Sequence, residues 1–466
     1  MSRQQQPSYP LPPLQPPPSP SPVTPPYSPG SGTGRRKLWI TSLVLGVLLA
    51  CGGGVYALWG GSDSPPNPSA AHDSGTAEAG AMVWKKTART EPSRGANAAP
   101  GAWFTPTTVV KAEPDMMTAY DLKTGAKQWS LVLDGVLCAA SRDADGDRVL
   151  IAVKAAGFCD GMAAIDIRRG VRLWSEPIAL HTGDDPDLDN FRPDKWKAEL
   201  EVAVNAGHGL ITWATGAKIV SLTDGKPVGD SPQKEPCRYV GAAGGSQMLT
   251  LARCDKRMRV RSQNPEALDK PKWTWEGRGE EEVDEVLSTR PVVLLTSDGQ
   301  GKPVQLVTLN DTDGKERSRI ELRRDHDGNI CSASVSKCPE YLIDGDTVYI
   351  ARKGSTTAYD LANGREKWTY KADANRTAFP VSVRDGQLAV YVPGTPERVG
   401  ELSRVSTRTG EAARTTHLAR DLRAIEWRLA RPRALVSHLK GDRLLLLNEG
   451  LLDSQDADVV VAVAAP

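Results

Sequence analysis

An eleven-residue motif that recurs along the chain limits the possible folds more than any other feature of the sequence. It reads Ala-x-Asp-x-x-x-Gly-x-x-x-Trp and occurs at residues 119–129, 164–174 and 358–368. Each copy opens with alternating apolar residues, which form a strand, and its Asp and Gly are residues that build a tight turn. The motif therefore predicts a β-hairpin whose second strand ends in a tryptophan. The fixed residues of the three copies are Asp121, Gly125, Trp129, Asp166, Gly170, Trp174, Asp360, Gly364 and Trp368.

Further hairpins of this kind fill the intervals. Weaker copies that lack the tryptophan lie at residues 220–226, 307–314 and 404–410. Another hairpin ends at Trp273 and Trp275, with a longer loop over 264–271 in place of the turn. Outer strands then recur about every 45 residues, which is typical of four-stranded propeller blades. They are expected near Trp84, Trp129, Trp174, Val228, Trp273, Arg317, Trp368 and Ala412. The sequence thus predicts an all-β, eight-bladed β-propeller, with seven blades as the alternative.

The two ends of this predicted domain complement each other. Residues 459–463 form an apolar strand with no outer strand after it, and residues 82–85 form a strand with nothing before it. Pairing the two would close the ring within one blade and protect a sheet edge that would otherwise be exposed. The tryptophans are interpreted as packing residues between blades, because a large ring can be buried while its indole N–H finds a partner.

One apolar segment near the N-terminus is long enough to cross a membrane. Residues 38–60 carry no charge and follow three cations at 35–37. A bilayer core requires about 20 apolar residues, and the positive-inside rule places those cations in the cytoplasm. We therefore expect a disordered, proline-rich cytoplasmic tail over 1–37, a transmembrane helix over 38–60 and a flexible linker over 61–80. The propeller, 81–466, would lie outside the cell membrane.

Two other interpretations of the apolar segment stay open. A cleaved secretory signal is disfavoured, because both the apolar run and the region before it are longer than in such signals. Lipoprotein anchoring would use Cys51, since Leu48 to Gly52 resembles a lipobox in which that cysteine becomes acylated. The apolar residues continue from Val55 to Trp59, as a spanning helix requires.

Six cysteines lie beyond the apolar segment, an even number that favours disulfides in an extracytoplasmic setting. They form three local pairs: Cys138 with Cys159, Cys237 with Cys254, and Cys331 with Cys338. Proximity favours a bridge within each pair, although six cysteines allow fifteen pairings and the sequence does not decide among them. A zinc site is disfavoured, because the sequence has no close Cys-x-x-Cys pair here and no histidine at ligand spacing.

The sequence contains no motif of the common hydrolase or metalloprotease classes, since neither Gly-x-Ser-x-Gly nor His-Glu-x-x-His occurs. A net charge of +1 gives no field that attracts nucleic acid. The acidic run 185–189 resembles the start of a calcium loop, but Asn190 and Trp196 stand where an EF-hand needs glycine and glutamate. We therefore interpret that run as solvated surface, with a looser calcium site as the alternative.

The repeated motif resembles the tryptophan-docking motif of propeller repeats of the pyrroloquinoline-quinone (PQQ) type. The chain is similar to membrane-anchored PQQ-like propellers of bacteria. Among these, the propeller subunit of the outer-membrane β-barrel assembly machinery is a protein-binding scaffold, and the resemblance to it is one of fold only. That subunit is a lipoprotein, whereas the proline-rich tail and single helix expected here look like those of actinobacterial envelope proteins.

The resemblance implies three functions to weigh. The first is a non-catalytic, membrane-anchored scaffold that uses no cofactor and binds an envelope protein or an extracellular ligand through its faces and central opening. The second is a PQQ-dependent oxidoreductase, which is opposed by the absence from the sequence of the adjacent cysteines common in those enzymes and of Cys-x-x-Cys-His. Inter-blade loops that we expect to be short oppose it too. The third is a sensor domain for a partner kinase.

Overall fold

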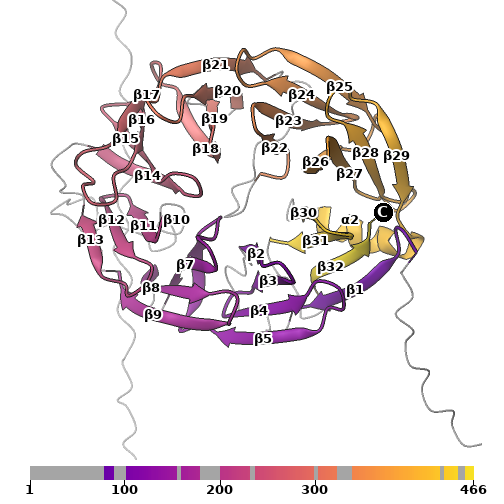
Figure 1. Cartoon of the computed structure of the whole chain (residues 1–466), viewed down its shortest axis with the longest axis horizontal. Coiled ribbons are helices and arrows are strands. Elements are labelled where there is room, and N and C mark those ends of the chain that lie inside the picture. Colours follow the sequence, from indigo (N-terminus) through magenta and orange to yellow (C-terminus); the bar gives the residue numbers. More distant parts are fainter. Residues whose placement is uncertain are drawn as a thin grey trace, which may run out of the picture. The chain divides into compact units, whose positions relative to one another are not determined.

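Eight antiparallel sheets of four strands stand around a central axis in the part of the chain that the computed structural model describes (Figure 1). The described residues are 78–88, 101–154, 159–178, 200–230, 237–298, 303–322, 338–430, 435–449 and 457–465. All belong to the second of two compact units, Met1–Ala71 and His72–Pro466. The tail, the apolar segment and nearly all of the linker lie outside them. No helix within these ranges is long and apolar enough to span a bilayer.

Blades 1 to 4 take their strands in chain order, from the innermost to the outermost. Blade 1 comprises β2 (Ala102–Phe104), β3 (Thr108–Ala112), β4 (Met116–Asp121) and β5 (Lys127–Val132). Blade 2 comprises β6 (Val136–Ala140), β7 (Arg148–Lys154), β8 (Cys159–Asp166) and β9 (Val171–Pro177). Blade 3 comprises β10 (Glu201–Asn205), β11 (His208–Trp213), β12 (Gly216–Ser221) and β13 (Pro227–Asp230). Blade 4 comprises β14 (Cys237–Ala243), β15 (Leu249–Cys254), β16 (Arg257–Ser262) and β17 (Trp273–Glu276).

Blades 5 to 7 follow the same order, and blade 8 combines both ends of the domain. Blade 5 comprises β18 (Glu282–Thr289), β19 (Val292–Ser297), β20 (Pro303–Leu309) and β21 (Glu316–Glu321). Blade 6 comprises β22 (Tyr341–Asp344), β23 (Thr347–Arg352), β24 (Ser355–Asp360) and β25 (Glu366–Lys371). Blade 7 comprises β26 (Phe379–Arg384), β27 (Gln387–Val392), β28 (Glu401–Ser406) and β29 (Ala412–His417). Blade 8 comprises β30 (Leu435–Lys440), β31 (Arg443–Asn448), β32 (Asp458–Ala464) and β1 (Met82–Thr87).

Strand β1 closes the ring by pairing with β32. The register sets Trp84 opposite Ala462 and Lys85 opposite Val461, so the expected pairing of residues 82–85 with 459–463 is confirmed. Each of the eight positions predicted for outer strands lies in an outer strand of the structure. The prediction of an eight-bladed, all-β propeller is therefore correct, and the seven-bladed alternative is wrong.

The repeated motif forms the hairpin between the third and the outer strand. In blade 1, Asp121 Oδ1 accepts hydrogen bonds from the backbone N–H of Lys123 (3.0 Å) and Thr124 (2.8 Å). Burial by itself raises the pKa of Asp121, but the bonds from Thr124 and Lys123 outweigh it and the pKa lies below its ordinary value. Gly125 completes the turn with a φ of +69°, which a residue without a Cβ adopts freely. The turn is thus built as the sequence predicts.

Each motif tryptophan packs on the turn glycine of the next blade. A Cβ on Gly125 of blade 1 would come within 2.6 Å of the Trp84 ring of blade 8. The Trp84 indole N–H donates to Leu122 O (3.2 Å), the carbonyl directly after the turn aspartate. The equivalent ring contacts join Trp129 to Gly170, Trp174 to Gly225, Trp273 to Gly314 and Trp368 to Gly410. Their role as packing residues between blades follows from these contacts.

The middle strands of each blade supply the core. In blade 8, Leu444 to Leu447 of β31 and Val459 to Val463 of β32 are fully buried. Both faces of these strands are covered by neighbouring blades, so continuous apolar runs replace the alternation of a half-exposed strand. One buried cluster joins Leu445 of blade 8 to Tyr120 of blade 1 and so spans the closure.

Two of the predicted cysteine pairs are disulfide-bonded. Cys138 is bonded to Cys159 within blade 2, and Cys237 is bonded to Cys254 within blade 4. Cys338 is disulfide-bonded as well. Cys331 lies outside the described residues.

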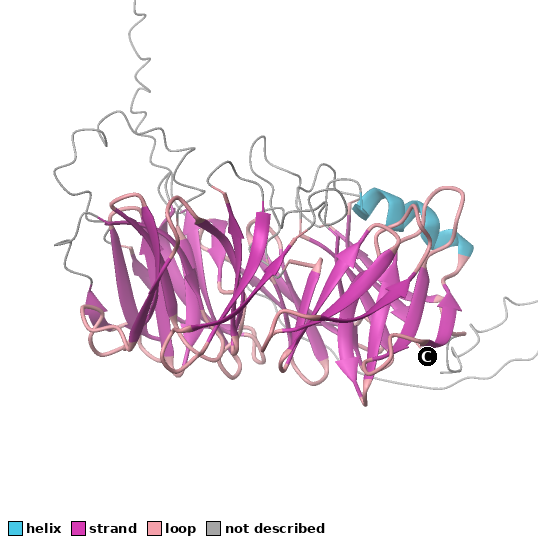
Figure 2. Ribbon diagram, turned by 90° about the horizontal axis from the view of Figure 1, so that it is seen from above, coloured by secondary structure: helices cyan, strands magenta, loops and turns pink. Residues whose placement is uncertain are grey.

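Two features differ from what the sequence led us to expect. A short helical segment, η2 (Arg420–Leu422) and α2 (Arg423–Ala430), connects blades 7 and 8 and lies on one face of the ring (Figure 2). The prediction of short inter-blade loops is wrong for several connections, the longest of which run over 178–200, 322–340 and 418–434. Helix α2 was not predicted from the sequence, because Glu426 stands among its apolar residues and obscures the helical pattern. In the fold its carboxylate is buried and accepts a bond from the Tyr391 hydroxyl (2.7 Å).

Candidate functional site

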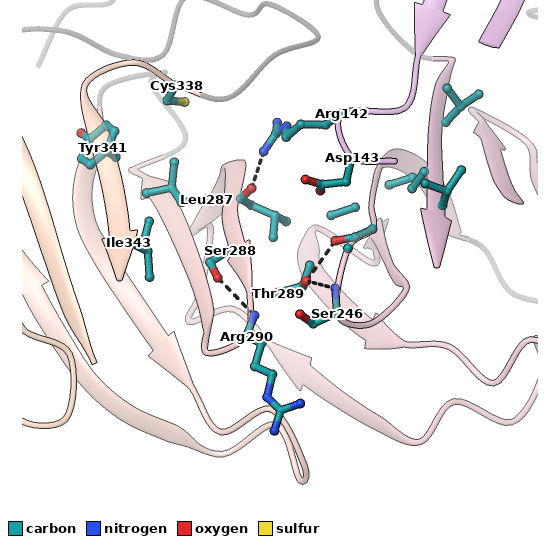
Figure 3. A pocket seen from close by; sticks show the side chains of 18 of the residues that line it. Arg142, Asp143, Ser246, Leu287, Ser288, Thr289, Arg290, Cys338, Tyr341 and Ile343 are labelled. Atoms are coloured by element: carbon teal, nitrogen blue, oxygen red, sulfur yellow. Dashed lines mark hydrogen bonds between the residues drawn. The ribbon is translucent and has the colours of Figure 1, made fainter. Parts of the chain in front are cut away.

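The innermost strand of each blade faces the axis, so β2, β6, β10, β14, β18, β22, β26 and β30 surround a central opening (Figure 1). Blades 2 to 6 line a cavity of about 240 Å³ in this opening. Its wall includes Arg142 and Asp143 after β6, Ser246 after β14 and Thr289 at the end of β18 (Figure 3). This cavity is the candidate site because side chains from five blades converge on it.

Arg142 crosses the opening from blade 2 to blade 5. Its guanidinium donates to Val286 O (2.7 Å) and forms an ion pair with Glu285. Burial by itself lowers the pKa of Arg142, but the charge and the hydrogen bond of Glu285 outweigh it and the pKa is raised. The side chain is therefore a fixed cation that ties together blades separated by two others (Figure 3).

The backbone on both sides of this contact is held in place. Ser141, next to Arg142, accepts a bond from the indole N–H of Trp103 in blade 1 (2.9 Å) through its carbonyl, and its hydroxyl accepts one from Leu150 N (3.2 Å). Strand β18 has irregular register on both sides of Glu285, between Val283 and Glu285 and between Val286 and Ser288. Such bulges redirect side chains, which explains how Glu285 reaches Arg142.

Glu201 of β10 precedes the cavity residue Val202 and has a shifted pKa. Part of the residue is exposed to solvent, but the surrounding protein desolvates its carboxylate. This desolvation, together with the nearby charge of Glu285, raises the pKa of Glu201 to about 7. The backbone N–H of Ala242 in blade 4 donates to its Oε2 (2.9 Å), and both this bond and the charge of Arg142 oppose the rise. Glu201 is thus partly protonated near neutral pH while it joins blade 3 to blade 4.

Hydroxyl and backbone groups complete the wall between blades 4 and 5. The Thr289 hydroxyl donates to Gly244 O (2.9 Å) and accepts from Ser246 N (3.1 Å). Gln247 Nε2 donates to Thr289 O (2.8 Å). These bonds fix the edge of the cavity and present small polar groups to it.

A second cavity of about 380 Å³ lies among blades 6, 7, 8 and 1. Its wall is more apolar and includes Tyr341, Val381 and Val436. Phe104 and His438 also line it, with ring centroids 4.9 Å apart and ring planes tilted by 54°. The cavity of blades 2 to 6 therefore has the Arg142–Glu285 pair at its wall, whereas the second cavity is somewhat more apolar but still includes Asp344, His438 and Lys440.

The residues that the sequence singled out lie away from these cavities, with one exception. The Asp, Gly and Trp residues of the motif belong to the outer hairpins, where they connect blades. Cys338 lines both cavities. The acidic run 185–189 lies outside the described residues, and no group of three or more His, Cys, Asp or Glu side chains suited to a metal ion occurs within them.

Sequence reasoning missed Arg142, Glu201 and Glu285. No local pattern links Arg142 to Glu285, because 143 residues separate them. The available indication was positional. Each of the three stands in or just after a first strand, and the first strands of a propeller face the axis.

The chain and its fold are similar to those of known proteins. A family model described as outer membrane protein assembly factor BamB matches residues 74–192 and 196–416. BamB from Moraxella catarrhalis is 14% identical with a TM-score of 0.48, over 78% of this chain and 96% of that one. The computationally designed protein Ika8 is 10% identical with a TM-score of 0.52, over 83% of this chain and 99% of its own.

A europium-containing methanol dehydrogenase is 11% identical with a TM-score of 0.45, over 78% of this chain and 84% of that one. A search of curated proteins gave no significant match. At 10% identity, the similarity to Ika8 supports the fold alone. The family model matches most of the chain, and this match is evidence of family membership.

Proposed function

The chain belongs to the PQQ-repeat propeller family described as outer membrane protein assembly factor BamB, and from this premise we propose that it is a non-catalytic binding scaffold of the cell envelope. The predicted helix over 38–60 anchors it in the membrane with the tail in the cytoplasm. The propeller holds a protein or an extracellular ligand at its central opening, without a cofactor.

The observation that carries this proposal is the engagement of the charged groups in the opening. Arg142 is held by Glu285 and by Val286 O, and Glu201 accepts a bond from Ala242 N. Groups that are bound to one another across blades stiffen the wall, and a preorganised wall loses little entropy when a ligand binds. The arrangement favours recognition by shape and by the polar edge at Thr289.

The cavity is tested by filling it. Ala243 lies at the end of β14 in the cavity wall and is partly exposed. We expect Ala243→Trp in the full-length chain to abolish the crosslinks to a partner that form in intact membranes. Val132→Trp is the matched control, because Val132 is 71% exposed on an outer strand. Equal crosslinking by both variants and the wild type would show that the opening is not the binding site.

The competing oxidoreductase function is tested on the same preparation. Addition of PQQ and calcium to the purified chain should produce neither a quinone absorption band nor reduction of an acceptor dye. Dye reduction that depends on PQQ would show that the protein is an enzyme and would refute the proposal of a non-catalytic scaffold.

The mode of anchoring is tested at Cys51. A spanning helix tolerates Cys51→Ser, so we expect the variant to stay in the membrane fraction after washing with high salt, with its propeller open to protease added outside the cells. Lipoprotein anchoring requires the acylated thiol, and release of the variant would establish it.

A further inference from the structure

The helical segment between blades 7 and 8 has one buried and one exposed face (Figure 2). Leu422, Ile425 and Leu429 pack into an apolar cluster shared by both blades. Exposed or half-buried side chains occupy the other face, at the spacing of three and four residues that gathers them on one side of a helix: Arg420, Arg423, Ala424, Trp427 and Arg428. The outer face thus combines three cations with an aromatic ring. Of the two acidic residues of the segment, Asp421 is exposed and Glu426 is buried.

The first turn of the segment carries an excess of positive charge. The Arg423 guanidinium donates to two backbone carbonyls, Arg420 O (3.1 Å) and Pro396 O (3.0 Å). Carbonyl oxygens accept these bonds but carry no net charge, so the cation is not neutralised. Arg420 and Asp421 are both exposed and offset each other. The charge of Arg423 therefore remains on the outer face.

The last turn of the helix adds to this charge. Arg428 forms an ion pair with Asp458 (2.9 Å), and Lys85 of β1 pairs with the same carboxylate (3.4 Å). The Asp458 side chain is 3% exposed, whereas that of Arg428 is 63% and that of Lys85 is 43% exposed. One buried carboxylate thus holds two cations that reach solvent, and the charge presented outwards by the three groups is positive.

The chain enters the domain beside this segment. Gly80, just before β1, accepts a hydrogen bond through its carbonyl from Ala419 N (2.9 Å), and Ala419 directly precedes η2. In the proposed function the membrane span ends at residue 60, and a linker of about 20 residues covers about 25 Å on average. The segment therefore adjoins the point where the tether joins the propeller. A tether raises the effective concentration of a surface, so a weak contact with lipid suffices there.

We propose that the exposed face of η2 and α2, together with Lys85, lies on the bilayer surface and binds anionic phospholipid headgroups, an inference that rests on the membrane anchoring in the proposed function. Each cation close to an anionic leaflet strengthens binding roughly fivefold. A tryptophan ring such as that of Trp427 favours the headgroup layer. The surface involves the edge of the ring at blades 7 and 8 and leaves the cavity of blades 2 to 6 to the ligand.

Photocrosslinking of the full-length chain in lipid vesicles tests the surface. The photoreactive residue p-benzoylphenylalanine replaces Ala424, which is exposed on the helix. The vesicles contain phosphatidylcholine alone or phosphatidylcholine with phosphatidylglycerol, and mass spectrometry quantifies the lipid adducts. We expect roughly fivefold more adducts, or a larger increase, with phosphatidylglycerol. Thr274, exposed on β17 of blade 4, is the matched control position and should give few adducts in either mixture.

Two double variants separate the charge of the first turn from its local structure. Arg420→Gln with Arg423→Gln removes two cations and should lower the adducts at residue 424 roughly fivefold or more in the phosphatidylglycerol vesicles. Arg420→Lys with Arg423→Lys keeps the charge without the guanidinium groups and should keep the adducts. Equal loss in both variants would show that the bonds of Arg423 position the helix and that its charge does not bind lipid, which would overturn the proposal.

Flotation of the vesicles at high salt separates this inference from the proposed function. A chain that does not float with the vesicles would refute the anchor and the surface together. A chain that floats but gives no adducts at residue 424, or equal adducts in the two lipid mixtures, would overturn the surface alone. In intact membranes, crosslinks from residue 424 to a protein in place of lipid would also overturn it.

Discussion

The junctions between blades fall into two groups, those that carry a docking tryptophan and those that do not. Within the described ring, five junctions place a tryptophan on the glycine turn of the next blade. For example, Trp368 of blade 6 packs on Gly410 of blade 7. The other three have Gly229, Ser318 and Arg414 at the corresponding position of the outer strand. The first group is apolar and uniform, whereas each member of the second is held differently.

The junction of blades 5 and 6 keeps the polar half of the docking contact. The hydroxyl of Ser318 donates to Leu361 O (2.6 Å), the carbonyl directly after the turn aspartate Asp360. Trp368 donates to the equivalent carbonyl of its own junction, Thr407 O (2.7 Å). A hydroxyl thus makes the hydrogen bond of an indole but cannot replace the ring.

The junction of blades 3 and 4 carries polar bonds near the axis. Glu201 accepts from Ala242 N (2.9 Å), and the Asn205 side chain donates to Gly245 O (2.6 Å). These polar bonds add to an apolar cluster that joins the same two blades and includes Ile219 of blade 3 and Tyr239 of blade 4. The difference teaches that the docking ring adds one shared contact to five junctions, whereas the other three add contacts of their own to the apolar core that all blades share.

Removal of a docking ring should have the largest effect. Trp368 is buried against Gly410 and Tyr349, so Trp368→Ala should lower the free energy of unfolding by about 3 to 5 kcal/mol. Urea unfolding followed by fluorescence measures the change. Trp368→Phe keeps much of the ring and loses the bond to Thr407 O, so its loss should be clearly smaller. Equal losses in the two variants would show that the buried ring is not what stabilises the junction.

A methyl group under the ring should be the next most disruptive change. A Cβ on Gly170 would overlap Trp129, and the φ of Gly170 is +68°. Gly170→Ala should therefore cost about 2 to 4 kcal/mol from backbone strain and overpacking combined. Gly345→Ala is the matched control, because Gly345 has a φ of +54° and open space around its Cα, so strain alone acts there. Melting temperatures that fall equally for both would contradict tight docking at Trp129.

The serine junction should respond more weakly. Ser318→Ala removes the bond to Leu361 O and should cost about 1 kcal/mol, while Ser318→Thr keeps a hydroxyl in place. Both are measured by urea unfolding. A loss for Ser318→Ala as large as that for Trp368→Ala would remove the distinction between the two groups of junctions.

Glu201 makes one junction sensitive to pH. Its pKa in the fold is raised from 4.5 to about 7, so the folded chain binds this proton more tightly than the unfolded chain does. The resulting stability is fully present below about pH 4.5 and is lost as the pH rises through about 7. Glu201→Gln should therefore raise the melting temperature at about pH 8 and leave it nearly unchanged at about pH 4. Glu280→Gln, at an exposed carboxylate, should leave the melting temperature unchanged at both pH values. If the melting temperatures of Glu201→Gln and the wild type differed by the same amount at every pH, the raised pKa would be refuted.

The sequence was sufficient for the ring and insufficient for the site, for physical reasons. Turn glycines such as Gly125 and rings such as Trp129 leave a local pattern, because a hairpin and its docking ring are specified within eleven residues. The pairing of Arg142 with Glu285 leaves none, since it depends on two bulges in β18 and on the curvature of the ring.

Hydrogen exchange at the blade junctions of the full-length chain tests most directly whether the docking tryptophans divide the junctions into two groups of different stability. We expect the amides of the tryptophan-covered turns, such as Gly125 and Gly225, to exchange slowly. The outer hairpin of blade 7, which has Arg414 in place of the tryptophan, should exchange faster. Equal protection at all eight junctions would contradict that division.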